Sequence, residues 1–201
     1  MHASRSNEIL HLDYLYMGTG VGEQKYCLIL KDDFSSYVWL FACSAATSEV
    51  AAESILSWVA SFGAMEWLVS DQGSHFKNQL ISQLSEELES RHHFTTAYTP
   101  WANGTVERVC REVIRTTRAL WSEWRLSPKD WPSVIEIIQS ILNDAPLKRL
   151  GKSLLGNGQQ YRSPLEVFTG QPATRPLLRA CPPTEFNNAP SIDEVRLFQE
   201  L

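Results

Sequence analysis

The stretch EILHLDYLYM, residues 8–17, decides the fold because it is a strand-forming run with an acid in its interior. Large aliphatic and aromatic residues of this kind are enriched in strands, whereas aspartate is depleted there. By the two-residue period of a strand, Asp13 shares its face with Ile9 and Leu15. An acid in this setting is a candidate functional group, and the alternative is a carboxylate that faces solvent at a sheet edge.

Two further strand patterns follow after short links, KYCLILKDD at 25–33 and SYVWLFAC at 36–43. Three successive strands with short connections predict an antiparallel meander. The rest of the chain alternates between helical and strand periodicity: we expect helices over 47–63, 78–91, 105–124, 130–145 and 163–170, and short strands over 65–73 and 93–98.

This order predicts a mixed α/β fold, in which a five-stranded sheet of three antiparallel strands and two further strands carries helices on both faces. We expect four segments along the chain: an N-terminal flank at 1–7, an α/β core at 8–146, a basic loop with a short helix at 147–172, and an arm or linker at 173–201 with one small helix near 191–201.

Composition excludes several classes of protein. The chain has 201 residues, 43% apolar and 20% charged, as in ordinary globular domains. It shows neither the long apolar run of a membrane span nor a signal peptide. Four cysteines without a C-x-x-C pair indicate neither a disulfide framework nor a thiolate zinc site, which favours a reduced intracellular protein.

The net charge of -5 conceals an asymmetry. Lys and Arg number 4 against 12 Asp and Glu in residues 1–90, but 6 against 3 in 91–125 and 6 against 1 in 145–180. Two basic zones behind an acidic half indicate polyanion binding, although ordinary solvated surface charge explains such numbers as well.

Two more carboxylates occupy positions suited to chemistry. Asp71 follows WLVS at the end of a predicted strand, and Glu107 lies in YTPWANGTVERV, residues 98–109, in the expected first turn of a helix. Both have structural explanations, because Asp is common in turns and an acid complements a helix N-terminus. Asp32 and Asp33 are expected to be surface acids at a strand end, and a metal-binding role for either is the open alternative.

The residue pattern of the helix that follows Glu107 favours a functional role for this carboxylate. Its apolar residues form one broad face, while four arginines form a stripe opposite: Arg108, Arg111, Arg115 and Arg118. Arginine binds phosphate through paired hydrogen bonds. A carboxylate beside bound phosphate is repelled unless a cation lies between them. Carboxylates without histidine or thiolate partners favour Mg²⁺ or Mn²⁺, and two such ions would support in-line phosphoryl transfer.

Several stretches resemble the catalytic core of retroviral and gypsy-type LTR-retrotransposon integrases, which are RNase H-like polynucleotidyl transferases. The similarity covers residues 8–172 and is carried by HLDYLYMG, KDDFSSYVWLFAC, FGAMEWLVSDQGSHFKNQL, FTTAYTPWANGTVER and SPLEVFTG. The 35 residues between Asp71 and Glu107 match the family's D,D-35-E triad. The resemblance implies that Asp13, Asp71 and Glu107 are catalytic and hold two metal ions.

The resemblance also implies activity and partners. It predicts an enzyme that trims the 3′ ends of element DNA and joins them to double-stranded target DNA, acting in the nucleus as a homo-oligomer without a membrane or organic cofactor. The expected DNA contacts are Trp101, Asn103, the arginine stripe, Lys148, Arg149 and Lys152. Trp101 replaces a glutamine that is frequent in the family, and a tryptophan can stack on an unpaired base.

We recognise neither the family's zinc-binding domain nor its C-terminal DNA-binding module, so a fragment or a degenerate copy is expected. Two other functions stay open. One is a domesticated integrase-like protein that binds DNA or assembles without catalysis, which the intact triad disfavours. The other is an RNase H-type nuclease, which the 35-residue spacing and NGTVER disfavour.

Overall fold

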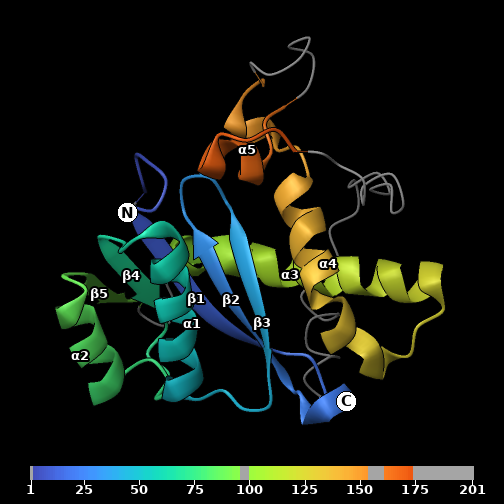
Figure 1. The fold of residues 1–201 in the computed structure, drawn as a ribbon, viewed down its shortest axis with the longest axis horizontal. Coiled ribbons are helices and arrows are strands. Elements are labelled where there is room, and N and C mark those ends of the chain that lie inside the picture. The colour runs from blue at the N-terminus through green and yellow to red at the C-terminus, as the bar shows by residue number, and fades with distance from the viewer. Residues whose placement is uncertain (1, 96–99, 154–160, 174–201) are drawn as a thin grey trace.

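The computed structural model describes residues 2–95, 100–153 and 161–173, except for the side chains of 100–107. A five-stranded sheet forms its centre (Figure 1), with the order β3-β2-β1-β4-β5. The strands are β1 (Ile9–Tyr16), β2 (Tyr26–Asp32), β3 (Val38–Cys43), β4 (Trp67–Ser70) and β5 (Arg91–Phe94). Strands β1 to β3 pair antiparallel, while β4 runs parallel to β1 and β5 parallel to β4. The predicted mixed sheet is confirmed.

Five α-helices are described: α1 (Ser48–Phe62), α2 (Gln79–Glu87), α3 (Pro100–Trp124), α4 (Trp131–Asp144) and α5 (Pro164–Thr169). Short 3₁₀ turns lie at η1 (Val21–Glu23), η2 (Pro128–Asp130) and η3 (Lys148–Leu150). The side chains of Thr47, Asn78 and Ser163 cap α1, α2 and α5 by accepting backbone N–H groups of their first turns.

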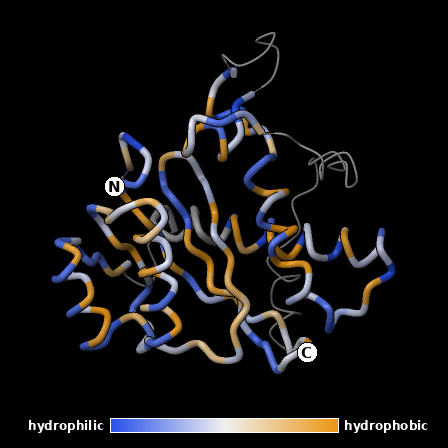
Figure 2. The backbone as a smooth tube through the Cα atoms, in the orientation of Figure 1, coloured by the Kyte–Doolittle hydropathy of each residue, from blue (hydrophilic) through white to orange (hydrophobic). Residues whose placement is uncertain are grey.

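The sheet separates two hydrophobic cores because successive strand residues point to opposite faces. Leu10, Leu12, Leu28 and Leu30 pack with α1 and α2 around the fully buried Trp58. On the other face, Leu15 of β1 and Cys27 and Ile29 of β2 pack with α3 and α4 around Trp131. Figure 2 shows hydrophobic residues concentrated along the central strands. Helices therefore cover both faces of the sheet, as predicted.

Helix α4 protects the edge strand β3. The side chain of Asn143 accepts a hydrogen bond from Val38 N and donates one to Val38 O, both at 2.8 Å. Gln139 accepts a further bond from Leu40 N at 2.7 Å. Unpaired backbone groups of an edge strand are open to pairing with other chains. Here the amide side chains form hydrogen bonds with the backbone groups of the β3 edge and thereby fix α4 against the sheet.

The segment after α4 returns to the core. Leu147 N donates to Arg162 O at 2.9 Å, and Phe168 of α5 stacks on Tyr37 with ring centroids 4.7 Å apart. Helix α5 is thus packed against the α1 side of the sheet, where Phe168 contacts the rings of Trp58 and Phe62. The small helix expected near 191–201 lies outside the described residues, and among those described no helix is long and apolar enough to cross a membrane.

Four local expectations are wrong. The helix expected over 78–91 ends at Glu87, and Arg91 belongs to β5. Helix α3 begins at Pro100 rather than near 105, because proline suits the first helical position and an internal glycine costs only about 1 kcal/mol. Glu107 therefore lies beyond the first turn, where the helix dipole does not explain it. Strand β5 covers 91–94, set by pairing with β4. Asp32 is fully buried, because it accepts hydrogen bonds from Asn7 N and from Ser35.

Candidate active site

The parallel pairing of β1 with β4 brings two of the predicted acids together. Its last bridged pair is His11 with Val69, and two residues further along each strand stand Asp13 and Asp71. Neighbouring strands lie about 4.8 Å apart, so the two backbones are close where β4 ends. The carboxyl end of a strand that neighbours a crossover is a usual place for a site in α/β sheets.

A tight turn orients Asp71. Its Oδ1 accepts the N–H of Gly73 at 2.9 Å and lies 3.8 Å from His75 Nε2. A Cβ added at Gly73 would lie 2.6 Å from the His75 ring and 3.0 Å from Asp71 Oδ1. The glycine is therefore required by close approach. The side chain of Asp71 remains 50% exposed, which leaves it accessible to a ligand.

Asp13 is linked directly to α3. The thiol of Cys110 lies 3.8 Å from Asp13 Oδ2 in hydrogen-bonding geometry. Asp13 is half-buried on the face of the sheet that α3 covers, beside the packed residue Leu15. Residues three apart on a helix are neighbours on one face, and Glu107 precedes Cys110 by three. The α3 backbone at Glu107 is thus one turn from the residue that contacts Asp13.

The predicted amphipathic character of α3 holds over its described side chains. Val109, Val113, Thr117 and Leu120 are buried, while the arginines lie outside the core. Arg108 and Arg118 are exposed, and Arg111 and Arg115 are half-buried. The side chains of Trp101, Asn103 and Glu107 lie outside the described residues, so their assignments stay predictions.

The second basic zone has a partly structural role. The guanidinium of Arg149 donates to Phe34 O and to Ser36 Oγ, and so holds the β2–β3 turn. Burial lowers the pKa of Arg149, and the nearby charge of Arg108 adds to this effect. Lys148 and Lys152 are exposed and available for phosphate, which remains a prediction.

A charged cluster lies on the same sheet face, two residues from Asp13. His11 Nε2 is 3.2 Å from Asp33 Oδ1, and Ala3 N donates to Asp33 Oδ2 at 2.8 Å. Burial opposes ionisation of Asp33, but these hydrogen bonds outweigh it and lower its pKa to about 2. Lys31 is 4% exposed. Burial, aided by Arg149, lowers the pKa of Lys31 to about 8.

The oxygen donors at this site suit a hard divalent cation. Asp13 lies in β1 and Asp71 directly follows the neighbouring strand β4, while Glu107 lies on the helix that contacts Asp13. Within the described side chains, no group of three or more His, Cys, Asp or Glu is close enough to hold a metal ion; the Glu107 side chain is outside that set. Carboxylate oxygens are the protein ligands that Mg²⁺ prefers.

The chain is similar to a known protein family and to proteins of retroviruses. The family described as "Integrase core domain" matches residues 3–100. The chain is 29% identical over 160 residues to the Gag-Pol polyprotein of avian reticuloendotheliosis virus, covering 79% of this chain and 13% of that protein. The chain thus spans about an eighth of that curated relative's length.

Solved structures show the same fold. The intasome of simian T-cell lymphotropic virus aligns with a TM-score of 0.68 and 18% identity over 95% of this chain and 63% of that chain. The HTLV-2 integrase catalytic core domain in complex with magnesium aligns with a TM-score of 0.63 and 16% identity, over 83% of this chain and 99% of that chain.

The fold is therefore the RNase H-like fold of integrase cores. The chain is similar to the region of retroviral polyproteins that it aligns with, and its residues 3–100 match the integrase core domain family.

Sequence reasoning missed Cys110, Gly73 and His75. Cys110 had a usable signal, because its spacing of three from Glu107 places both on one helix face. The roles of Gly73 and His75 depend on a close approach of a backbone atom and a ring, which no local pattern encodes.

Proposed function

We propose that this chain is the catalytic core of a DNA integrase that uses a divalent metal ion for phosphoryl transfer. One observation carries the proposal. The β1–β4 register places Asp13 beside Asp71, and the Cys110 thiol of α3, the helix that contains Glu107, contacts Asp13. Three carboxylates from three elements would then face one site. The family of the chain, which is typically made of polynucleotidyl transferases, supports this assignment.

Asp13, Asp71 and Glu107 would hold Mg²⁺ or Mn²⁺, two ions in our proposal. Bound there, such ions would activate the attacking oxygen and stabilise the leaving oxygen of an in-line displacement. In end trimming, a water oxygen attacks phosphorus and the 3′ oxygen leaves as a hydroxyl. In joining, that 3′ hydroxyl attacks a target phosphodiester and displaces a new 3′ hydroxyl.

The protein supplies rigid positioning for these steps. Asp13 lies within the central strand β1, and the Gly73 N–H orients Asp71. The exposed Arg108 and Arg118, with the half-buried Arg111 and Arg115, would attract the DNA backbone along α3. Preorganised charges of this kind act mainly on the charge that develops in the transition state.

The wider context is part of the proposal. We infer that the substrates are the double-stranded DNA ends of a retrotransposon or retroviral element and a target DNA, and that the place of action is the nucleus. The similar solved structures include an intasome and a core domain described in dimeric and trimeric forms, which supports action as a homo-oligomer.

The test is a reversal assay, in which the isolated core resolves a branched DNA that mimics the joined product, with Mg²⁺ or Mn²⁺. We expect resolution by the wild type and its loss in Asp13→Asn and Glu107→Gln. Glu123→Gln is the matched control, because Glu123 is an exposed acid of the same helix. Full activity of Glu107→Gln would refute the triad. DNA binding by the wild type without resolution would instead support a domesticated, catalytically idle protein.

A further inference from the structure

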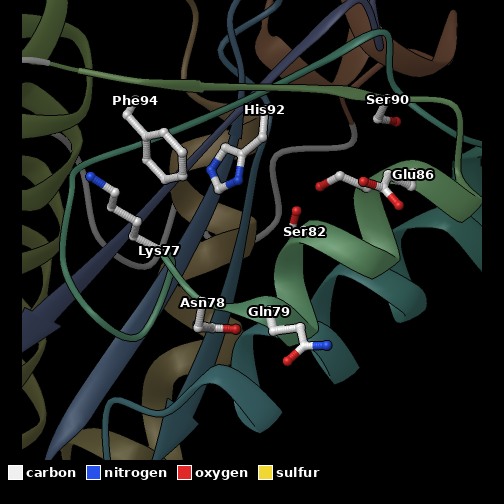
Figure 3. A pocket seen from close by; sticks show the side chains of 9 residues that line it. Lys77, Asn78, Gln79, Ser82, Glu86, Ser90, His92 and Phe94 are labelled. Carbon is white, nitrogen blue, oxygen red and sulfur yellow. The ribbon is translucent and has the colours of Figure 1, made fainter.

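A hollow of about 540 Å³ lies between α2 and β5, apart from the candidate metal site. Figure 3 shows its lining side chains. Those that matter here are Lys77, Ser82, Glu86, His92 and Phe94. We call this hollow the α2–β5 pocket.

One wall of the α2–β5 pocket is aromatic. His92 and Phe94 are two residues apart on β5 and therefore point to the same face of the sheet. Their ring centroids are 4.1 Å apart, with an interplanar angle of 40°. Both side chains are half-buried. Aromatic walls bind planar rings by stacking, and this accepts any nucleobase because every base has a π-face. The wall therefore favours a flat ligand.

The pocket is also polarised. Lys77 and Phe94 stand at one end, Glu86 at the other, and His92 between them (Figure 3). The Lys77 ammonium lies 5.8 Å from the centroid of the Phe94 ring, and Lys77 and Glu86 are both exposed. A ligand that matches this pattern has an anionic group beside its ring at one end and hydrogen-bond donors at the other. The Ser82 side chain adds a hydroxyl between the two ends.

We propose that the α2–β5 pocket binds a single nucleotide whose base carries an exocyclic amino group. The base would stack on the outer face of the packed His92–Phe94 ring pair. The phosphate would meet Lys77, and the amino group would point to Glu86. Carboxylates accept hydrogen bonds from such amino groups, whereas thymine presents none. The proposal goes beyond the metal-dependent reaction and needs none of its three carboxylates.

The pocket is connected to Asp71 by hydrogen bonds. His92 Nε2 lies 2.9 Å from Ser70 Oγ, and Ser70 Oγ donates to the carbonyl of Asp71 at 2.9 Å. Burial lowers the pKa of His92 to about 4, with a small contribution from His93. The imidazole is therefore uncharged at neutral pH, and a stacked base meets no cationic ring. A nucleotide seated on His92 is two hydrogen bonds away from the Asp71 backbone.

Two sources share this chemistry, a free nucleotide and an unpaired nucleotide of a DNA strand. Two-dimensional ¹H–¹⁵N NMR of the whole chain separates them by titration with dAMP, thymidine monophosphate, deoxyadenosine, inorganic phosphate and a single-stranded tetranucleotide. We expect dAMP to shift the amide signals of Lys77, His92 and Phe94, with weaker binding of thymidine monophosphate. Shifts at these residues by the tetranucleotide alone also support the pocket, with DNA as the source.

Variants make the site falsifiable. Lys77→Gln should weaken dAMP binding by about fivefold, as expected for one partly exposed ion pair, without changing deoxyadenosine binding. Phe94→Leu should weaken both by about tenfold, with circular dichroism to confirm folding. Lys129→Gln, which alters an exposed lysine on η2, is the control. Equal dAMP affinity of Lys77→Gln and Lys129→Gln, or no shifts at the pocket, would overturn the proposal.

The experiments test the nucleotide-binding proposal and the catalytic proposal independently. Asp13→Asn is expected to lose DNA resolution and to keep wild-type nucleotide binding. A wild-type chain that resolves DNA but ignores every nucleotide refutes the pocket alone. A chain that binds dAMP at the pocket but never resolves DNA refutes the catalytic proposal alone.

Discussion

Replacing Gly73 by alanine should disturb the candidate site through one side chain, His75. The new Cβ would lie 2.6 Å from His75 Cε1, 2.7 Å from His75 Nε2 and 3.0 Å from Asp71 Oδ1. Atoms do not approach so closely, so the ring or the turn must move. The ring is held at 4.9 Å from the Tyr14 centroid and 4.4 Å from the Phe76 centroid, which restricts its retreat.

Overpacking of this kind costs about 1–3 kcal/mol. Because Gly73 has no left-handed backbone conformation, the cost comes from the contact and not from φ. Joining activity should fall at least about tenfold, since small misplacements of catalytic groups can reduce rates by about a hundredfold.

A double-mutant cycle with His75→Ala isolates the contact. Without the imidazole ring, the methyl group of Gly73→Ala has space. The loss of unfolding free energy in the double variant should therefore be smaller than the sum of the losses in the two single variants, by about 1 kcal/mol or more. Urea denaturation measures the coupling, and the DNA resolution assay should show partial recovery in the double variant. Additive costs, or full activity in Gly73→Ala alone, would refute the reasoning.

Three further predictions address other contacts. Cys110→Ser should retain DNA resolution, since a hydroxyl can still donate to Asp13, whereas Cys110→Ala should lower it severalfold without loss of folding by circular dichroism. The lowered pKa of His92 means that the unfolded chain takes up its proton first as pH falls from about 6.5 to 4, so stability should decrease over that window. The decrease is on the order of 1–2 kcal/mol because part of the ring faces solvent, and it should vanish in His92→Asn when urea unfolding is repeated across pH. Asn143→Leu should lower the free energy of unfolding in urea by about 2–4 kcal/mol, because the backbone N–H and carbonyl of Val38 lose their hydrogen-bond partner. A decrease below about 0.5 kcal/mol would contradict the role of Asn143 in pairing the edge of β3.

Much of the fold was predictable because its signals are local. The apolar run of β2, the helical period of α4 and the serine cap of α5 each lie within one segment. Predictions failed where distant segments compete with local preference. Strand β5 takes the residues that pair with β4, and Asp32 is buried because Asn7 and Ser35 supply its hydrogen bonds.

The candidate site divides in the same way. The sequence by itself determined which acids stand out, the 35-residue spacing between Asp71 and Glu107, and the arginine stripe of α3, since these follow from residue type and position along one chain segment. Only the tertiary structure decided that Asp13 lies level with Asp71 and that Cys110 meets Asp13. Strand register and helix docking are set by hydrogen bonds and packing between segments far apart in the chain, and no local pattern records those partners.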